Sequence, residues 1–228
     1  MQNNINIASK TPSALATNKV LRNTYALLGV SLFPTVIGAL MGMSMSWGFA
    51  ASSPILFMIM TLGGIFGMFF LIQKNKNSSL GVVFLLVLTF LLGLMLGPIL
   101  QVAFSLSNGG QIVSLAAGGT GAIFLVLAGI AQTSKRDFSF MGKFLMIGLI
   151  MLILASLVNM FFQIPAASLA ISAIAVMIFS GFILYDVNRI VKGGETNYIM
   201  ATVTIYISIL NIFLTILQFL GMFAGNRN

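Results

Sequence analysis

Residues 166–185 have the sequence AASLAISAIAVMIFSGFILY and are followed directly by Asp186. This run contains no charged residue, and its 20 residues are the length that an α-helix needs to cross a bilayer. A carboxylate at the centre of a membrane helix costs about 2.5 to 3.5 kcal/mol, so an acid that adjoins such a run indicates a function or a partner. Asp186 is therefore the first candidate functional residue.

The composition of the whole chain agrees with a membrane location. Hydrophobic residues make up 59% of the 228 residues and charged residues only 6%, a balance that a water-soluble surface does not tolerate. The net charge of +8 is spread singly or in pairs between apolar runs, whereas a nucleic-acid-binding face needs its Lys and Arg residues clustered. We therefore expect an integral membrane protein that binds no nucleic acid.

Six further apolar stretches are long enough to cross the bilayer, which predicts an all-α polytopic membrane protein with seven transmembrane helices. The predicted spans are 23–46, 54–73, 80–100, 111–133, 140–162, 166–187 and 198–222. They divide the chain into a polar N-terminal tail (1–22), a transmembrane domain (23–222) and a short C-terminal tail (223–228). Because no apolar signal-peptide core precedes the first span, we expect that span to remain as an anchor.

Basic residues alternate between the breaks that separate the spans. The N-terminal tail and the breaks after spans two, four and six contain Lys or Arg, and the breaks after spans one, three and five contain neither. The positive-inside rule then predicts a cytoplasmic N-terminus and, after seven spans, a periplasmic C-terminus.

Small residues and prolines predict how the helices pack. Gly63 and Gly67, and likewise Gly93 and Gly97, are spaced so that a neighbouring helix backbone can approach closely. Pro34 and Pro98 are expected to kink spans one and three.

The last span carries polar residues at helical spacing, which places them on one face. We expect this stripe to face the interior of the bundle, where it either forms hydrogen bonds between helices or lines a hydrated path. Its members are Thr204, Ser208, Asn211, Thr215 and Gln218.

Asp186 also has a simpler explanation than function. It lies near the end of its span, where Arg189 and Lys192 can pair with it or water can solvate it. The chain contains no Cys and no His, so soft metal sites and imidazole catalysis are excluded, and an aspartyl intramembrane protease would need a second membrane Asp. We therefore expect neither an enzyme nor a bound cofactor.

The C-terminal part of the chain resembles the signature of a known family. Residues 185–221, YDVNRIVKGGETNYIMATVTIYISILNIFLTILQFLG, are similar to the C-terminal signature of the Bax inhibitor-1 family of multi-spanning membrane proteins. Within that family the segments KVLRNTY (19–25), LGPIL (96–100), ISA (171–173) and GGETNYIMATV (193–203) resemble the bacterial YccA-like branch. The resemblance implies seven membrane helices with the last one at the centre of the bundle.

The resemblance to the YccA-like branch also implies a function. Members of this branch modulate the membrane-anchored AAA protease FtsH, together with its partners HflK and HflC, in the bacterial inner membrane. Their short N-terminal tail is a handle for the protease, so residues 1–17 are a candidate handle here, although a solvated terminus without function would have the same composition. The loop motif of Gly193, Gly194, Glu195, Thr196 and Asn197 belongs to the matching segment and is a further candidate for function.

Other members of the family suggest an alternative function, a pH-sensitive calcium leak. In those members two Asp residues on the last two helices share a proton. Asp186 matches the first of them, but Ser208 occupies the position of the second and cannot titrate. The basic partner expected in span two is absent as well, because residues 51–73 contain no charge. A membrane scaffold without transport is a third hypothesis.

Overall fold

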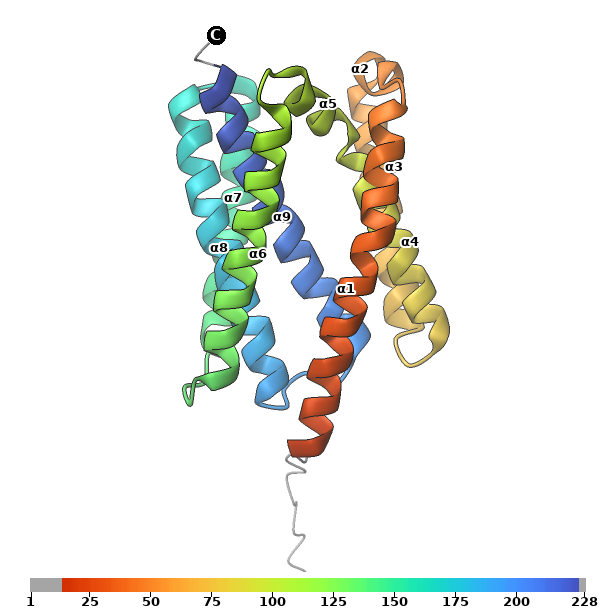
Figure 1. Ribbon diagram of the computed structural model, residues 1–228, viewed down its shortest axis with the longest axis vertical. Coiled ribbons are helices and arrows are strands. Elements are labelled where there is room, and N and C mark those ends of the chain that lie inside the picture. The colour runs from red at the N-terminus through yellow and green to blue at the C-terminus, as the bar shows by residue number, and fades with distance from the viewer. Residues whose placement is uncertain (1–13, 226–228) are drawn as a thin grey trace, which may run out of the picture.

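The computed structural model describes residues 14–225, which form nine α-helices and contain no strand (Figure 1). The helices are α1 (Ala14–Ser44), α2 (Gly48–Ser52), α3 (Pro54–Lys74), α4 (Ser79–Met95), α5 (Gly97–Ser105), α6 (Gly109–Thr133), α7 (Met141–Phe162), α8 (Pro165–Val191) and α9 (Tyr198–Gly225). Seven segments of this part of the chain are long and apolar enough to cross a membrane, as predicted, with α4 and α5 together making the third.

The first span begins earlier than we predicted. Helix α1 starts at Ala14, so residues 14–22, which we assigned to the polar tail, are helical. Exposed Lys19 and Arg22 lie on this helix below the apolar run. Hydropathy marks where a helix enters hydrocarbon rather than where it begins, which explains the difference. The candidate handle is therefore helical from residue 14 onward, and its residues 1–13 lie outside the described residues.

The third span is interrupted. Helix α4 ends at Met95, Leu96 forms the junction, and α5 continues from Gly97 to Ser105. Pro98 has no N–H to donate back into α4, so the regular helical hydrogen bonding cannot continue through this point. The predicted effect of Pro98 is confirmed as a break, and the span ends five residues after the predicted boundary at 100.

Close backbone packing joins α1 to α4 and α5. A side chain added at Gly93 would overlap the backbone of Thr35, and one added at Gly97 would meet Gly42. The close approach predicted for Gly93 and Gly97 is confirmed. The same prediction is wrong within this chain for Gly63 and Gly67, because both are exposed and have no neighbouring atom within 4 Å of an added Cβ.

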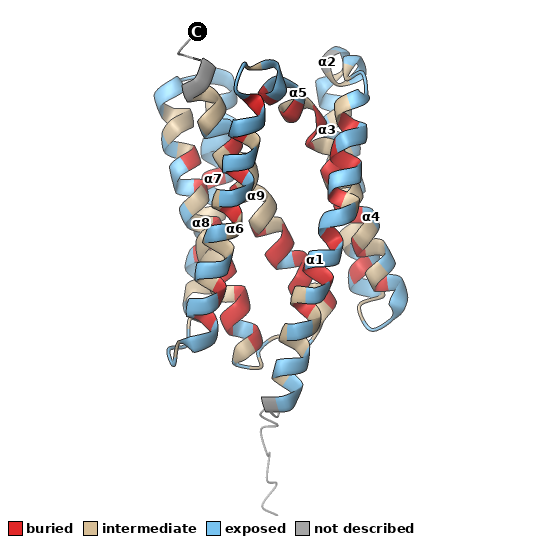
Figure 2. Cartoon of the chain, in the orientation of Figure 1, coloured by how far each residue is buried: buried red, intermediate tan, exposed pale blue. Residues whose placement is uncertain are grey.

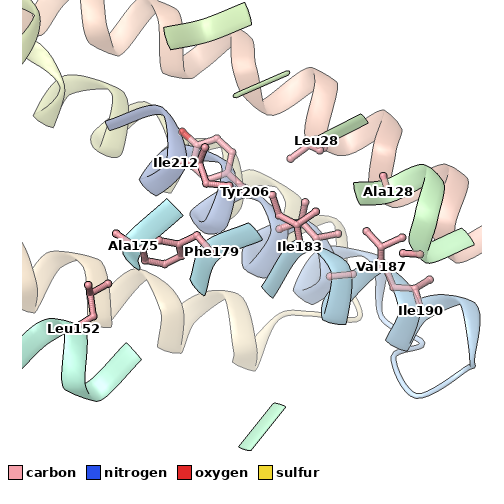
Figure 3. Packing of buried hydrophobic residues seen from close by; sticks show 13 residues of the cluster. Leu28, Ala128, Leu152, Ala175, Phe179, Ile183, Val187, Ile190, Tyr206 and Ile212 are labelled. Carbon is pink, nitrogen blue, oxygen red and sulfur yellow. The ribbon is translucent and has the colours of Figure 1, made fainter. Parts of the chain in front are cut away.

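Helix α9 lies at the centre of the bundle and contacts α1, α3, α4, α5, α6 and α8 (Figures 1 and 2). Its side chains take part in every apolar cluster of the described core. The largest cluster joins α9 to α8 through residues such as Tyr206, Ile183 and Val187 (Figure 3). The central last helix that the family resemblance implied is thus present in the structure.

A hydroxyl pair fixes α9 against α1 at mid-depth. The hydroxyl oxygens of Tyr206 and Thr35 are 2.6 Å apart, and both residues are buried. The Thr35 hydroxyl also lies 2.8 Å from the carbonyl of Ser31, to which it donates, so it accepts from Tyr206. This contact between helices was not anticipated from the sequence, although Tyr206 lies within the segment that resembles the family.

The outward surface of the bundle is apolar. Large hydrophobic side chains such as Phe33, Phe66, Phe144 and Met177 are each at least two-thirds exposed. A soluble protein cannot expose so much apolar surface, whereas a bilayer solvates it. The backbones of α1 and α6 stay apart, although Tyr25 of α1 contacts Phe124 and Gln132 of α6. Between the two helices lies an apolar cavity of about 600 Å³ that is closed at the back by α9.

The basic breaks all lie at one end of the bundle. The start of α1 and the loops 75–78, 134–140 and 192–197 are at the lower end in Figure 1, and the C-terminal end of α9 is at the upper end. The predicted C-terminal tail is helical through Gly225, and its residues 226–228 lie outside the described residues.

Candidate functional site

Asp186 lies in the last two turns of α8 and is only 9% exposed. Its carboxyl group interacts with the hydroxyl of Thr204 on α9, and Arg189 and Glu195 are the charged side chains that act on it. Ser208, the position of the second acid in leak members, lies one turn farther along α9 and donates to the carbonyl of Thr204 (3.1 Å). Asp186 therefore faces a hydroxyl rather than a second carboxylate.

The two basic residues expected to neutralise Asp186 have other partners. The Nη2 atom of Arg189 lies 3.7 Å from Oε2 of Glu195, and its Nε donates to the carbonyl of Gly194 (3.2 Å). Lys192 donates from Nζ to the carbonyl of Lys135 in the loop between α6 and α7 (3.1 Å). Asp186 thus forms no direct ion pair with any described residue, and it is not open to bulk water.

The loop motif begins with a glycine turn that ends α8. Gly193 has a positive φ of 75°, which suits glycine, and its N–H donates to the carbonyl of Ile190 (2.9 Å). The N–H of Gly194 donates to the carbonyl of Arg189 (2.8 Å), which completes a Schellman motif. The two glycines are therefore explained by chain reversal at the end of the helix.

The remaining residues of the loop motif begin α9 and hold a neighbouring loop. Glu195 Oε1 accepts hydrogen bonds from the N–H groups of Thr196 (3.0 Å) and Asn197 (2.9 Å). Asn197 Oδ1 caps α9 by accepting from the N–H of Met200 (3.0 Å), and its Nδ2 donates to the carbonyl of Lys76 (2.8 Å). The motif thus joins α8, α9 and the loop between α3 and α4 at the basic end.

Asn188 is an anchor that our sequence analysis missed. It is 1% exposed, and its Oδ1 accepts from the N–H of Phe138 (3.0 Å). Its Nδ2 donates to the carbonyls of Arg136 (3.2 Å) and Ala131 (3.4 Å). The sequence did contain a sign of this role, because Asn188 follows Asp186 closely at the end of an apolar span. An amide side chain in such a place needs polar partners.

The loop that Asn188 anchors contains the acid Asp137. The hydroxyl and the backbone N–H of Ser139 both donate to its carboxylate, and Lys192 is close enough to attract it. These interactions lower the pKa of Asp137 below its ordinary value, so it stays ionised at neutral pH.

Most of the polar stripe of α9 forms hydrogen bonds within its own helix, and among the described residues Thr204 is the member that bonds to another helix, through Asp186. Asn211 donates to the carbonyl of Ile207 (2.8 Å) and Thr215 to that of Asn211 (2.7 Å), as Thr204 and Ser208 donate to earlier turns of the same helix. Ser208 and Thr215 are buried, whereas Thr204 and Gln218 are exposed. The stripe therefore faces the interior only in part.

The described residues offer no obvious place for a metal. No group of three His, Cys, Asp or Glu side chains comes together anywhere between residues 14 and 225. The site contains the buried acid Asp186, the ion pair of Arg189 and Glu195, and the loop anchors Asn188 and Asn197. All of them lie where α8 ends and α9 begins.

Seven apolar spans, of which the last is the central helix α9 with its polar stripe, and basic loops at one end define a polytopic helical membrane protein. The family model described as inhibitor of apoptosis-promoting Bax1 matches residues 17–225. The chain therefore belongs to the Bax inhibitor-1 family.

Its relatives come from bacteria and match over almost their whole length. A membrane protein of Vibrio cholerae serotype O1 is 44% identical over 96% of both chains. The modulator of FtsH protease YccA of Escherichia coli K12 and the inner membrane protein YccA of Escherichia coli O6:H1 are each 41% identical over 92% of both chains. The chain is accordingly a multi-pass protein of the inner membrane.

Proposed function

We propose that this protein binds the FtsH protease together with HflK and HflC and modulates its degradation of membrane proteins. The observation that carries the proposal is the 41% identity, over 92% of both chains, to a relative named as a modulator of FtsH protease. Because the similarity extends over all seven spans rather than one segment, a shared mode of action is the simplest explanation.

The side chains of the site support a binding role better than a catalytic one. Two of the three acids, Asp137 and Glu195, are used in loop hydrogen bonds, and the third, Asp186, contacts a hydroxyl. General acid–base catalysis needs a titrating group within reach of a substrate and a second group in a complementary role. We therefore propose that the protein is not an enzyme and acts through the protease it contacts.

We place the end of the bundle that holds the basic loops 75–78, 134–140 and 192–197 in the cytoplasm, following the positive-inside rule. This orientation puts the start of α1, which residues 1–13 precede in the sequence, on the side from which an AAA protease pulls its substrates. The tail can then serve as the handle that the family resemblance implies.

The test is affinity capture from detergent-solubilised bacterial membranes, with an unrelated seven-span protein that carries the same tag as the control. We expect FtsH, HflK and HflC to be recovered with this protein and not with the control. Overproduction should lengthen the half-life of FtsH membrane substrates in pulse-chase measurements. Recovery of none of the three partners, with unchanged substrate turnover, would show that the proposal is wrong.

Burial of Asp186 beside Thr204 favours a second candidate function, a cation leak. An unpaired acid inside a membrane bundle is commonly part of an ion path. Asp186 lines neither the 600 Å³ cavity nor the larger cavity at the end of the bundle opposite the basic loops. The leak is therefore kept as the second candidate.

Liposomes separate the two functions. If the protein is a leak, purified protein should admit calcium faster than empty vesicles do, and Asp186→Asn, which removes the charge and nearly keeps the shape, should change the rate. Calcium entry equal to that of empty vesicles at every pH would eliminate the leak and leave the modulator standing.

A further inference from the structure

A second cavity, of about 1010 Å³, lies at the end of the bundle opposite the basic loops. Its walls come from α5, α7, α8 and α9. In the described part of the chain the backbone of α5 does not approach that of α7 or α8, and the backbone of α7 does not approach that of α9, so helix packing leaves this space open. Gln163 after α7 and Pro165 at the start of α8 line the cavity, which puts it where hydrocarbon meets the headgroup layer.

The lining of this outer cavity is amphipathic and uncharged. None of the described residues that line it is Asp, Glu, Lys or Arg. Apolar side chains such as Ile99, Val102 and Leu217 form most of the wall. Hydroxyl and amide groups complete it, from Ser156, Asn159, Gln163, Ser168, Ser172 and Gln218. A ligand that matches this lining is neutral where it meets the wall and has both apolar and hydrogen-bonding parts.

Half of these polar groups already have partners within the protein. Ser156 donates to the carbonyl of Leu152 (2.8 Å), and Asn159 donates from Nδ2 to the hydroxyl of Ser168 (2.7 Å). Ser168 in turn lies 3.3 Å from the carbonyl of Ile164. These three side chains shape the cavity without needing a ligand.

The other half have no partner in the part of the chain that the structure describes. Ser172 is 8% exposed, and its hydroxyl makes no hydrogen bond to any described residue. No fully enclosed side-chain nitrogen or oxygen atom in residues 14–225 is without a partner, so the Ser172 oxygen must reach the open space of the cavity. The amides of Gln163 and Gln218 likewise have no partner among the described residues. A nearly buried hydroxyl is unfavourable unless something in the cavity bonds to it.

We propose that the outer cavity binds the glycerol-ester region of a membrane phospholipid. The ester carbonyls accept hydrogen bonds from the Ser172 hydroxyl and from the amide N–H groups of Gln163 and Gln218. The acyl chains follow the apolar wall toward the membrane centre, and the headgroup stays at the surface. The described lining contains no Lys or Arg to pair with the phosphate charge, and at the boundary of the hydrocarbon the ester carbonyls are the neutral acceptors that a phospholipid presents.

The test compares two phospholipids with the same ethanolamine headgroup, one with ester-linked and one with ether-linked chains. Full-length protein is reconstituted into vesicles of an equal mixture of the two, extracted in mild detergent and analysed by native mass spectrometry. We expect about tenfold more diester than diether lipid to be retained, since the ether lacks the carbonyl acceptors. The double variant Ser172→Ala, Gln218→Leu should lose that preference.

Ser156→Ala is the matched control, because it removes a hydroxyl from the same cavity that already donates within its own helix. It should retain the diester lipid as the unmodified protein does, and thermal unfolding of each variant shows that the bundle is intact. Equal retention of the two lipids by the unmodified protein, or an equal preference for the diester lipid in the double variant and in Ser156→Ala, would overturn the proposal and leave a cavity that holds water only.

Discussion

Gly93→Ala should destabilise the bundle by about 3 kcal/mol, the upper part of the range for added volume in a packed core. The new Cβ would overlap the carbonyl of Thr35 and come within 2.8 Å of its Cα. Both atoms belong to the backbone of α1, so no side-chain rotation relieves the overlap and the helices must separate. Titration with sodium dodecyl sulfate in mixed micelles, followed by circular dichroism, measures the loss as a lower unfolding midpoint.

Gly67→Ala is the control for this prediction. It makes the same chemical change in a membrane helix at an exposed glycine with no atom within 4 Å of the added Cβ. We expect a change within about 0.5 kcal/mol, or a slight gain from better helix propensity. If both variants unfold at the same point, the close packing of α1 on α4 contributes nothing particular to stability.

The two glycine pairs show why packing was harder to predict than the spans. The number of spans follows from the lengths of the apolar runs and the alternation of basic residues, which are local properties. Gly93 and Gly63 belong to the same small-residue pattern, yet only Gly93 meets another backbone. The arrangement of the whole bundle decides which neighbour a helix face contacts. The four-residue spacing of the glycines therefore cannot predict which pair is packed against another helix.

The candidate site was also predictable only in part: its residues could be identified from the sequence, but not their contacts. The rarity of Asp186 was enough to identify it, and the structure brings it next to α9 as the family resemblance led us to expect. Its partner is Thr204 rather than Ser208 because the contact depends on the register between α8 and α9. Apart from the contact between Thr204 and Asp186, the α9 stripe bonds within its own helix rather than between helices, because a carbonyl of the preceding helical turn is always within reach of a Ser, Thr or Asn side chain.

Asn188→Ala should cost about 2 kcal/mol, near the middle of the range for a buried polar group left without its partner. The substitution leaves the N–H of Phe138 without its acceptor and the carbonyls of Arg136 and Ala131 without their donor. Asn108→Ala is the control, since Asn108 is exposed and its side chain makes no capping hydrogen bond to α6, and it should change stability by less than about 0.5 kcal/mol.

The effect of Asn188→Ala should be concentrated in the loop between α6 and α7, because all three hydrogen bonds of the side chain end there or at the last turns of α6. Lys135 and Arg136 are exposed trypsin sites in this loop. Limited proteolysis of the purified protein should cleave the variant at these sites several times faster, as the loop opens locally before the bundle unfolds. Cleavage after Lys74, at the end of α3, and after Lys76, in the loop that Asn197 holds, should keep its original rate. Equal acceleration at both loops would mean that Asn188 stabilises the whole bundle rather than this loop.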